Sequence, residues 1–243
     1  MTTNRSGGSA AEVAILIPAY QAAASIGDVV RRSLAILPDV LVIDDGSTDG
    51  TAAVARDAGA EVVSLPRNQG KGDALETGFG LLFDRGSTSV VTLDADGQHL
   101  PEQVPVLLDA AADGADLVLG SRQHLFADMS PVRRFANRLS SRAISFAAGR
   151  PLVDIQTGFR FYSRRLVDAV GLPESRFEAE SAVVVRAARR GFRIATVPVE
   201  LGFADGRTTS HFRPVVDSLR IAGAVVRARF VGSPRATPVD ASV

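Results

Sequence analysis

Short apolar segments alternate with segments of helical spacing from Val13 onward, and this alternation constrains the fold more than any other feature. We predict strands at Val13–Ile17, Val40–Ile43, Glu61–Ser64, Val90–Leu93, Leu117–Leu119, Ile155–Tyr162 and Ile194–Val199. We predict helices at Ile26–Leu37, Gly50–Ala58, Lys71–Phe83, Glu102–Ala112, Pro131–Ala148, Ala179–Arg190 and Val215–Val231, with Ser25 as the N-cap of the first. Such alternation is typical of βαβ units and predicts an α/β fold with a mostly parallel central sheet.

The composition narrows the classes of protein to which the chain can belong. Its 27 basic and 27 acidic residues give a formal net charge of zero, which argues against a nucleic-acid-binding protein. The chain has no Cys, which excludes disulfides, thiolate metal sites and Cys nucleophiles and fits a cytoplasmic protein. The segment Met1–Ala11 lacks the apolar core typical of a signal peptide, and no uncharged apolar run approaches the roughly 18 to 20 residues of a membrane-spanning helix.

An acidic turn, Asp44–Asp49, follows the second predicted strand and precedes a helix. Ligands of open α/β sheets bind at the carboxyl ends of the strands, where carboxylates can accept hydrogen bonds from ribose hydroxyls or a base edge. The alternative is an Asp-Gly turn in which Ser47 or Asp49 caps the next helix. Taken alone, the motif favours this structural alternative.

A second acidic turn, Asp94–His99, follows the fourth predicted strand. Asp94 and Asp96 are spaced i and i+2, so in an extended segment their carboxylates point the same way. Such hard oxygen ligands suit Mg²⁺ or Mn²⁺ beside substrate phosphates, where the metal stabilises charge on a departing diphosphate. A turn with a helix cap is again the alternative, but two acidic turns after two strands of one sheet favour a ligand site.

These motifs, in their order and spacing, make the chain resemble the inverting family 2 glycosyltransferases. The residues that carry the resemblance are Ile17–Tyr20, Asp44–Asp49, Asn68–Gly72, Asp94–His99, Asp154–Arg160, Phe177–Glu180 and Ser210–Pro214. The last three sets look like the dolichyl- or polyprenyl-phosphate sugar synthase branch. The resemblance extends over residues 13–225 and implies a GT-A type, Rossmann-like fold and a metal-dependent hexosyltransferase.

The resemblance also implies roles for residues in the first half of the chain. The residues that would bind the nucleotide sugar are Pro18, Tyr20, Asp45, Lys71 and Asp94. Asp96 would bind Mg²⁺ or Mn²⁺, and Gln98 would complete the metal site. The chain departs from the family at Gln21-Ala22, where Asn-Glu is usual, and the missing carboxylate bears on recognition of the base.

In the second half, the resemblance implies a phosphate acceptor held by basic and polar side chains, because the Arg fork makes paired hydrogen bonds with phosphate. The acceptor-binding candidates are Arg122, Arg133, Arg134, Gln156, His211 and Arg213. Arg122 and Arg133, with Asp96 and Glu178, are also the catalytic candidates. The structural alternatives are solvated surface arginines, a structural His211, and acidic residues such as Glu178 and Glu180 that favour a helix start.

We expect one catalytic domain at residues 12–231, with a nucleotide-binding half at 12–120 and an acceptor half at 121–231, between disordered ends at 1–11 and 232–243. The expected reaction moves a hexose from a GDP-mannose or UDP-glucose type donor to polyprenyl or dolichyl phosphate. Such an anionic acceptor needs positioning rather than a strong base. Two alternatives stay open: transfer to a sugar hydroxyl with Glu178 as base, or a non-catalytic nucleotide-binding relative. A nucleotidyltransferase is disfavoured, because Pro18 stands where its Gly-rich loop would begin.

A lipid-linked acceptor implies attachment to the inner face of a membrane, directly or through a separate membrane protein. Two amphipathic segments that carry arginines, Phe135–Phe146 and Val215–Val231, fit an anionic lipid surface. Their apolar faces would equally suit packing against the sheet. The interpretation we adopt is a peripheral location on the cytoplasmic side.

Overall fold

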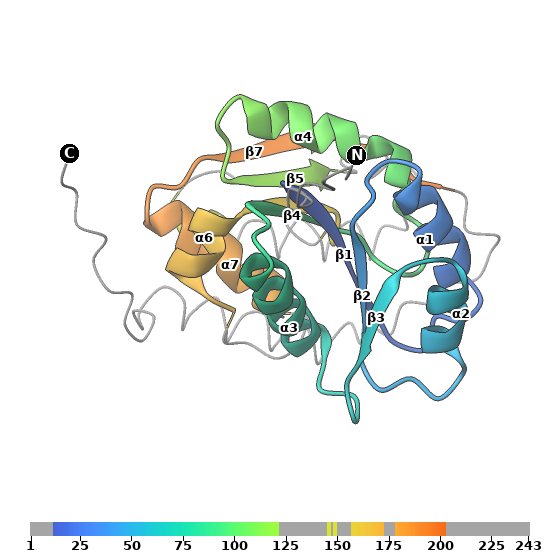
Figure 1. The fold of residues 1–243 in the computed structure, drawn as a ribbon. Coiled ribbons are helices and arrows are strands. Elements are labelled where there is room, and N and C mark those ends of the chain that lie inside the picture. Colours follow the sequence, from blue (N-terminus) through green and yellow to red (C-terminus); the bar gives the residue numbers. More distant parts are fainter. Residues whose placement is uncertain (1–11, 122–144, 147, 150–156, 173–177, 203–243) are drawn as a thin grey trace, which may run out of the picture.

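The computed structural model describes residues 12–121, 145–146, 148–149, 157–172 and 178–202 (Figure 1). The helices predicted at Pro131–Ala148 and Val215–Val231 lie almost wholly outside these residues, as do both ends predicted to be disordered. The expected domain boundaries therefore stay predictions.

A seven-stranded sheet forms the centre of the described chain, in the order β3-β2-β1-β4-β6-β5-β7 (Figure 1). Its strands are β1 (Val13–Ala19), β2 (Val40–Asp44), β3 (Glu61–Ser64), β4 (Ser89–Thr92), β5 (Leu117–Ser121), β6 (Arg160–Ser163) and β7 (Ile194–Pro198). β6 is antiparallel to β4 and β5, whereas the other described pairings are parallel. The predicted mostly parallel α/β sheet is confirmed.

The strand predicted at Ile155–Tyr162 needs correction, because β6 begins only at Arg160. The backbone turns just before it, where the Phe159 amide donates to Thr157 Oγ1 over 3.2 Å. The Gly158 carbonyl accepts from Thr92 Oγ1 over 2.8 Å, which ties this segment to the end of β4.

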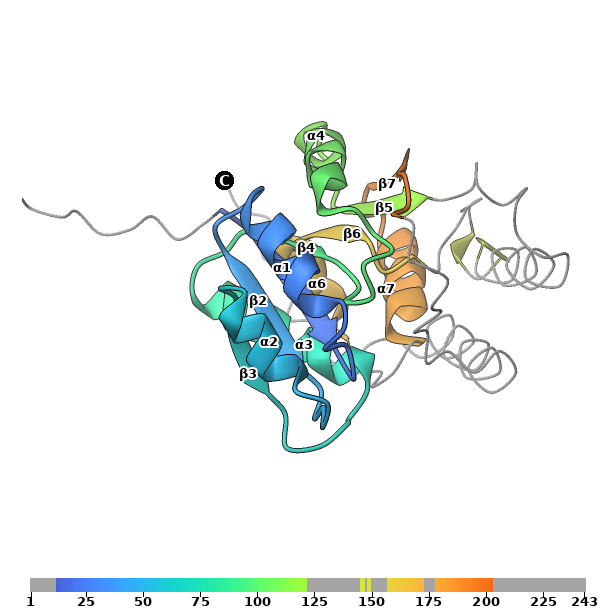
Figure 2. The ribbon, with the colours of Figure 1, turned by 90° about the vertical axis from the view of Figure 1, so that its right-hand side faces the viewer.

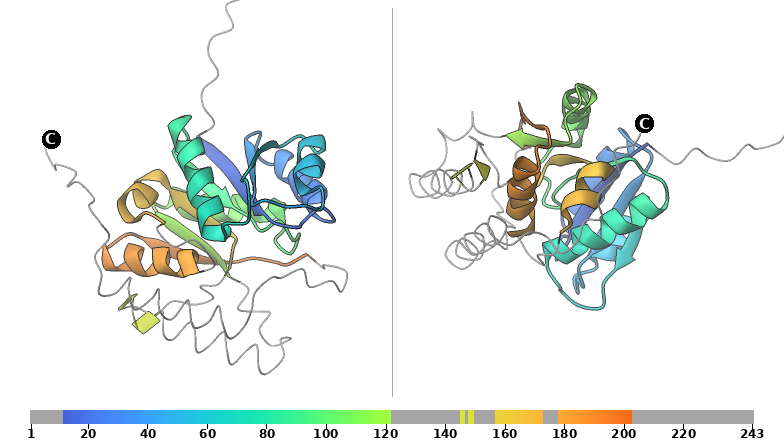
Figure 3. Two further views of the ribbon diagram at one scale, coloured as in Figure 1. Left: turned by 90° about the horizontal axis from the view of Figure 1, so that it is seen from below. Right: turned by 90° about the vertical axis from the view of Figure 1, so that its left-hand side faces the viewer.

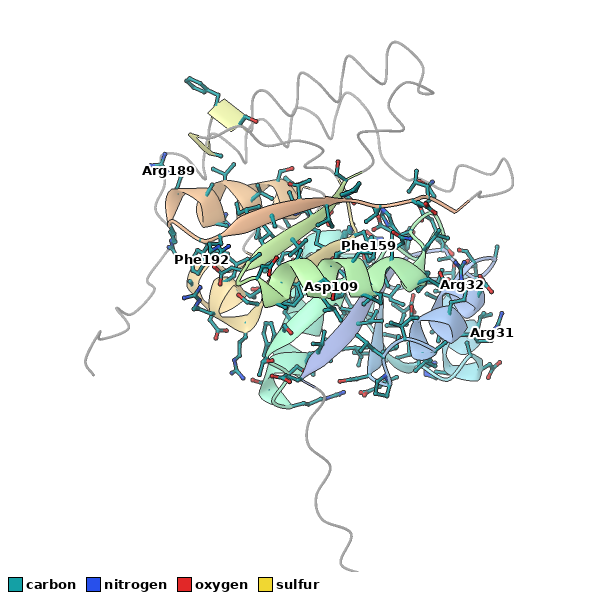
Figure 4. The ribbon with its side chains drawn as sticks, turned by 90° about the horizontal axis from the view of Figure 1, so that it is seen from above. Arg31, Arg32, Asp109, Phe159, Arg189 and Phe192 are labelled. Atoms are coloured by element: carbon teal, nitrogen blue, oxygen red, sulfur yellow. The ribbon has the colours of Figure 1, made fainter. Side chains whose placement is uncertain are left out.

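Helices cover both faces of the sheet (Figures 2 and 3). The helices on one face are α1 (Ile26–Leu34), α2 (Thr51–Asp57) and α4 (Val104–Ala112), which follows a 3₁₀ turn, η1 (Pro101–Gln103). The helices on the other face are α3 (Lys71–Asp84), α6 (Arg164–Val170) and α7 (Glu178–Arg189). Alternate strand residues point to opposite faces, so Ile15 packs in the core under α1 and α4 while Leu16 packs in the core under α3. Phe159 belongs to the first of these cores and lies beside α4 in Figure 4.

The parallel strands β1, β2 and β4 bring the two acidic turns to one edge of the sheet. Ala19 pairs with Asp44 at the ends of β1 and β2, and Leu16 pairs with Thr92 of β4. The antiparallel β6 begins at this same edge, since Thr92 also pairs with Arg160. The carboxyl edge of the sheet therefore collects residues from both halves of the chain.

Candidate functional site

Asp94 lies at the centre of the carboxyl edge, two residues beyond the end of β4. Its Oδ1 accepts a hydrogen bond from the Lys71 ammonium over 2.6 Å, and its Oδ2 is 3.5 Å from Nδ1 of the buried His99. The carboxylate rests against the backbone of Gly158, where an added Cβ would lie 2.5 Å from the Asp94 Cγ. Only glycine at 158 leaves room for Asp94 in this position.

Lys71 joins Asp94 to charged residues of the second half of the chain. Its ammonium lies 2.9 Å from Glu180 Oε2, on α7. Arg160, which is fully buried at the start of β6, has its Nε 3.7 Å from Glu180 Oε1 and donates from Nη1 to the Glu180 carbonyl over 2.8 Å. Asp94, Lys71, Glu180 and Arg160 thus form a row of alternating charges, which we call the Asp94–Arg160 network.

The electrostatics keep both cations of this network charged. Burial of the Lys71 ammonium is the largest single influence and opposes its charge, but Asp94 and Glu180 together outweigh it and raise the Lys71 pKa above its ordinary value. Burial likewise opposes the charge of Arg160, yet its pKa is raised by Tyr162 and Glu180. Two cations and two carboxylates therefore balance one another at this edge of the sheet.

Asp45 holds the Gly-rich loop that precedes α3. The buried Asp45 carboxylate accepts the Gln69 amide over 2.7 Å and the Gly70 amide over 2.8 Å. Gly46 has a φ of +71°, and a Cβ there would lie 2.5 Å from the Arg67 carbonyl carbon, so the loop packs directly on the turn. The first acidic turn thereby fixes the backbone from which Lys71 projects.

The segment after β1 is held by polar side chains of the first acidic turn. The backbone N–H of Gln21 donates to Ser47 Oγ over 2.9 Å, and the side-chain Nε2 of Gln21 donates to Thr48 Oγ1 over 3.0 Å. The Ala22 amide donates to Thr51 Oγ1 over 2.7 Å. Gln21 has a φ of +53°, which is unusual for a residue other than glycine. This strained position follows directly on Tyr20, one of the predicted nucleotide contacts.

Two carboxylates of the first acidic turn, Asp44 and Asp49, stabilise the turn and the start of α2. Asp44 Oδ1 accepts the Ser47 amide over 3.1 Å, and Asp49 Oδ1 accepts the Thr51 amide over 3.0 Å at the start of α2. Ser25 stands at the N-cap of α1, but its hydroxyl makes no capping bond and donates to the Ala95 carbonyl over 2.7 Å. The prediction of Ser25 as the N-cap residue is confirmed, although its hydroxyl bonds to the second acidic turn instead of capping the helix.

The donor atoms of the second acidic turn fit Mg²⁺ or Mn²⁺. Asp96 Oδ1 accepts the Gln98 amide over 2.9 Å, which orients this carboxylate within the turn. No three His, Cys, Asp or Glu side chains among the described residues gather as a metal cage. Mg²⁺ commonly binds through one or two carboxylates together with substrate phosphates, so a cage is not required. Since Lys71 engages Asp94, Asp96 is the carboxylate of this turn that best suits the metal.

Some of the remaining predicted residues lie within the described part of the chain and the others lie outside it. Pro18 and Tyr20 are partly exposed at the carboxyl edge, as is Gln98 in the second acidic turn. Glu178 opens α7 and is partly exposed, whereas Glu180 is buried within the network. The acceptor candidates outside the described residues are Arg122, Arg133, Arg134, Gln156, His211 and Arg213.

Sequence reasoning assigned no role to Arg160 or Gly158. One pattern could have indicated a buried ion pair. Arg160 is a charged residue directly before the apolar pair Phe161-Tyr162, and a buried arginine needs a partner. Gly158 gave no comparable signal, because the residue that it contacts in space, Asp94, is remote in sequence.

The chain is similar to glycosyltransferases over most of its length. The sequence model of glycosyl transferase family 2 matches residues 14–171. Glycosyltransferase AglJ of Haloferax volcanii is 36% identical over 193 residues, which cover 76% of this chain and 61% of that protein. Undecaprenyl-phosphate mannosyltransferase of Micrococcus luteus is 34% identical over 206 residues, covering 77% and 82% of the two chains. Polyprenol monophosphomannose synthase of Mycolicibacterium smegmatis is 32% identical over 199 residues, covering 76% and 75%.

Solved structures confirm the fold. Glucosyl-3-phosphoglycerate synthase from Mycobacterium tuberculosis, in complex with Mg²⁺ and uridine diphosphate, has a TM-score of 0.71 at 21% identity, covering 92% of this chain and 81% of that chain. The same enzyme with Mn²⁺, uridine-diphosphate-glucose and phosphoglyceric acid has a TM-score of 0.71 at 20% identity, covering 96% and 88%. The expected GT-A type fold is therefore confirmed. No helix within the described part of the chain is long and apolar enough to cross a membrane.

Proposed function

The chain belongs to glycosyl transferase family 2, and on that premise we propose that it moves a hexose from a nucleotide sugar to a polyprenyl phosphate. The observation that carries the proposal is the second acidic turn, in which Lys71 fixes Asp94 and the turn itself orients Asp96. The acceptor class is supported by similarity to an undecaprenyl-phosphate mannosyltransferase and to a polyprenol monophosphomannose synthase. The chain spans only 61% of the length of AglJ. Its activity, substrates and partners are therefore proposals.

The donor half binds the nucleotide sugar at the carboxyl edge. Pro18, Tyr20 and Asp45 border the base and ribose, and Asp94 contacts the nucleotide. Asp96 and Gln98 would hold Mg²⁺ or Mn²⁺, which when bound supplies positive charge that stabilises the leaving diphosphate. Buried charges around this edge are fixed in place before the reaction, so they need little reorganisation as charge develops.

The acceptor half positions a phosphate oxygen for attack on the sugar C1. The new C1–O bond forms on the face opposite the breaking bond to the diphosphate, so the anomeric configuration inverts. A phosphate acceptor is already anionic near pH 7, so no residue has to remove a proton. Arg122 and Arg133 would hold the acceptor phosphate, with Arg134, Gln156, His211 and Arg213 around it.

A donor and acceptor panel tests the proposal. The purified chain is incubated with GDP-mannose or UDP-glucose, each with Mg²⁺ or Mn²⁺, and with a short polyprenyl phosphate or the matching polyprenol. We expect sugar transfer only to the phosphate acceptor and only with metal present. Equal transfer to the polyprenol would overturn the acceptor assignment and favour a hydroxyl acceptor with Glu178 as base.

Substitution of Asp96 tests the metal assignment. We expect Asp96→Ala to lose roughly 100-fold or more in transfer rate while it stays folded, because a stabilising charge on the diphosphate is lost. The matched control is Asp113→Asn, since Asp113 is exposed just after α4. Near wild-type transfer by folded Asp96→Ala would show that Asp96 does not hold the metal.

The acceptor proposal further predicts a peripheral location at the cytoplasmic face of a membrane, held directly or through a separate membrane protein. The candidate segments, Phe135–Phe146 and Val215–Val231, lie almost entirely beyond the described residues. Co-sedimentation of the chain with anionic vesicles at low and high salt tests direct attachment. Absence of pelleting at either salt, with full activity on a water-soluble acceptor, would refute surface attachment and favour transfer to a sugar hydroxyl.

A further inference from the structure

The Glu180 carboxylate occupies an unusual place in the Asp94–Arg160 network. Its side chain is 8% exposed, its Oε2 lies 2.9 Å from the Lys71 ammonium, and its Oε1 lies 3.7 Å from Arg160 Nε. Oε1 is buried and accepts no hydrogen bond from the residues that the structure describes. The carboxylate is therefore enclosed between two cations.

The position of Lys71 depends on two carboxylates rather than one. A lysine ammonium ends a flexible four-carbon stem, so a single ion pair fixes it poorly. In this chain Asp94 holds the Lys71 ammonium at 2.6 Å and Glu180 holds it at 2.9 Å. Glu180 in turn is attached to β6, because its backbone carbonyl accepts from Arg160.

Asp94 has little freedom to compensate for a shift of Lys71. The carboxylate already lies against Gly158, whose hydrogen atoms leave no further room on that side. A change in the position or charge of Lys71 therefore acts directly on the direction of Asp94. Loss of the Glu180 charge would also leave two buried cations beside one carboxylate, which is costly in a region shielded from water.

We propose that Glu180 is a positioning residue for nucleotide binding: it holds the Lys71 ammonium on Asp94 and so fixes the direction in which Asp94 meets the nucleotide. The inference rests on the proposed function, and it extends it by assigning to α7, in the acceptor half, a task in the donor site. Glu180 thereby links α7 to the donor site through Lys71.

Binding of GDP and of UDP, each with Mg²⁺ and without acceptor, tests the inference by calorimetry. The variants are Glu180→Gln, Asp94→Asn and the double variant, with the exposed Glu76→Gln of α3 as the matched control. We expect Glu180→Gln to weaken binding of the preferred nucleotide about 10-fold, as for other residues that orient a ligand-binding group. We expect the double variant to bind no more weakly than Asp94→Asn alone, because Glu180 acts through Asp94.

Comparing the double variant with the two single variants distinguishes a positioning role of Glu180 from a general structural role. A residue that merely stabilises the fold would weaken binding by the same factor with or without Asp94, so additive losses would overturn the inference. Nucleotide affinity of Glu180→Gln equal to that of the wild type would overturn it as well. If Glu180→Gln does not fold, Glu180→Asp serves instead, because it keeps the negative charge but moves it away from Lys71. We then expect the same non-additivity with a smaller loss of nucleotide affinity. A wild-type chain that binds neither nucleotide would overturn the proposed function itself, which is a distinguishable result.

Discussion

Replacement of Gly158 by alanine tests whether Asp94 must rest against the backbone before β6. The new Cβ would lie 2.5 Å from the Asp94 Cγ, which is 0.9 Å inside the 3.4 Å at which ordinary contact begins. The φ of Gly158 is not in the left-handed region, so the substitution adds a clash without backbone strain. The carboxylate has to move by about 1 Å, and a misplacement of that size can cost about 100-fold in rate.

The expected result is a folded protein with a strongly reduced transfer rate. We expect Gly158→Ala to lower the free energy of unfolding by about 1 to 3 kcal/mol, the usual cost of overpacking, and to weaken nucleotide binding. Urea denaturation, calorimetry and the transfer assay measure the three effects. The matched control is Gly80→Ala on α3, where an added Cβ meets nothing within 4 Å and alanine favours the helix by about 0.5 to 1 kcal/mol. Wild-type affinity and transfer in folded Gly158→Ala would refute the placement of Asp94.

Three further predictions address the loop, the core and the buried tyrosine. Asp45→Ala leaves two loop amides without their acceptor, so we expect the free energy of unfolding to fall by about 2 to 3 kcal/mol in urea denaturation; no change would contradict the contact. Gly78→Ala places a Cβ 2.7 Å from Leu16 Cδ2 and should lower the free energy of unfolding by about 1 to 3 kcal/mol. The same substitution made in a Leu16→Ala chain should cost less, because the clashing side chain is gone, and an equal cost would contradict the contact. Burial raises the pKa of Tyr162 to about 12 from 10.0, so above pH 10 the folded chain binds more protons than the unfolded chain and stability falls as pH rises. Tyr162→Phe should make that fall shallower by on the order of 2 kcal/mol at pH 12, and an unchanged slope would refute the assignment.

The sequence predicted the strands and helices of the first half closely, because their signals are local. Val40–Ile43 lies within β2, where a run of buried apolar residues identifies a central strand. Glu61–Ser64 coincides with β3, a half-exposed strand at the edge of the sheet, which its β-branched residues Val62 and Val63 indicate. The helix Arg164–Val170 was missed. It is only seven residues long, and packing of Leu166 and Val170 in the core stabilises it more than its own propensity does.

The antiparallel β6 was also beyond the reach of the sequence pattern. Its apolar residues predicted a strand but carried no information about direction or neighbours. Pairing of Arg160 with Thr92 of β4 determines both, and that pairing joins residues far apart in the chain.

The sequence by itself determined that two acidic turns follow two strands of one sheet, because residue type and strand order are local properties. The tertiary structure alone decided what each carboxylate does. Asp45 holds the Gly-rich loop, Asp94 pairs with Lys71, and Glu180 rather than Glu178 enters the buried network. The physical reason is that the orientation of a buried charge is set by its partners, and here those partners come from α3, β6 and α7, which only the folded sheet brings together.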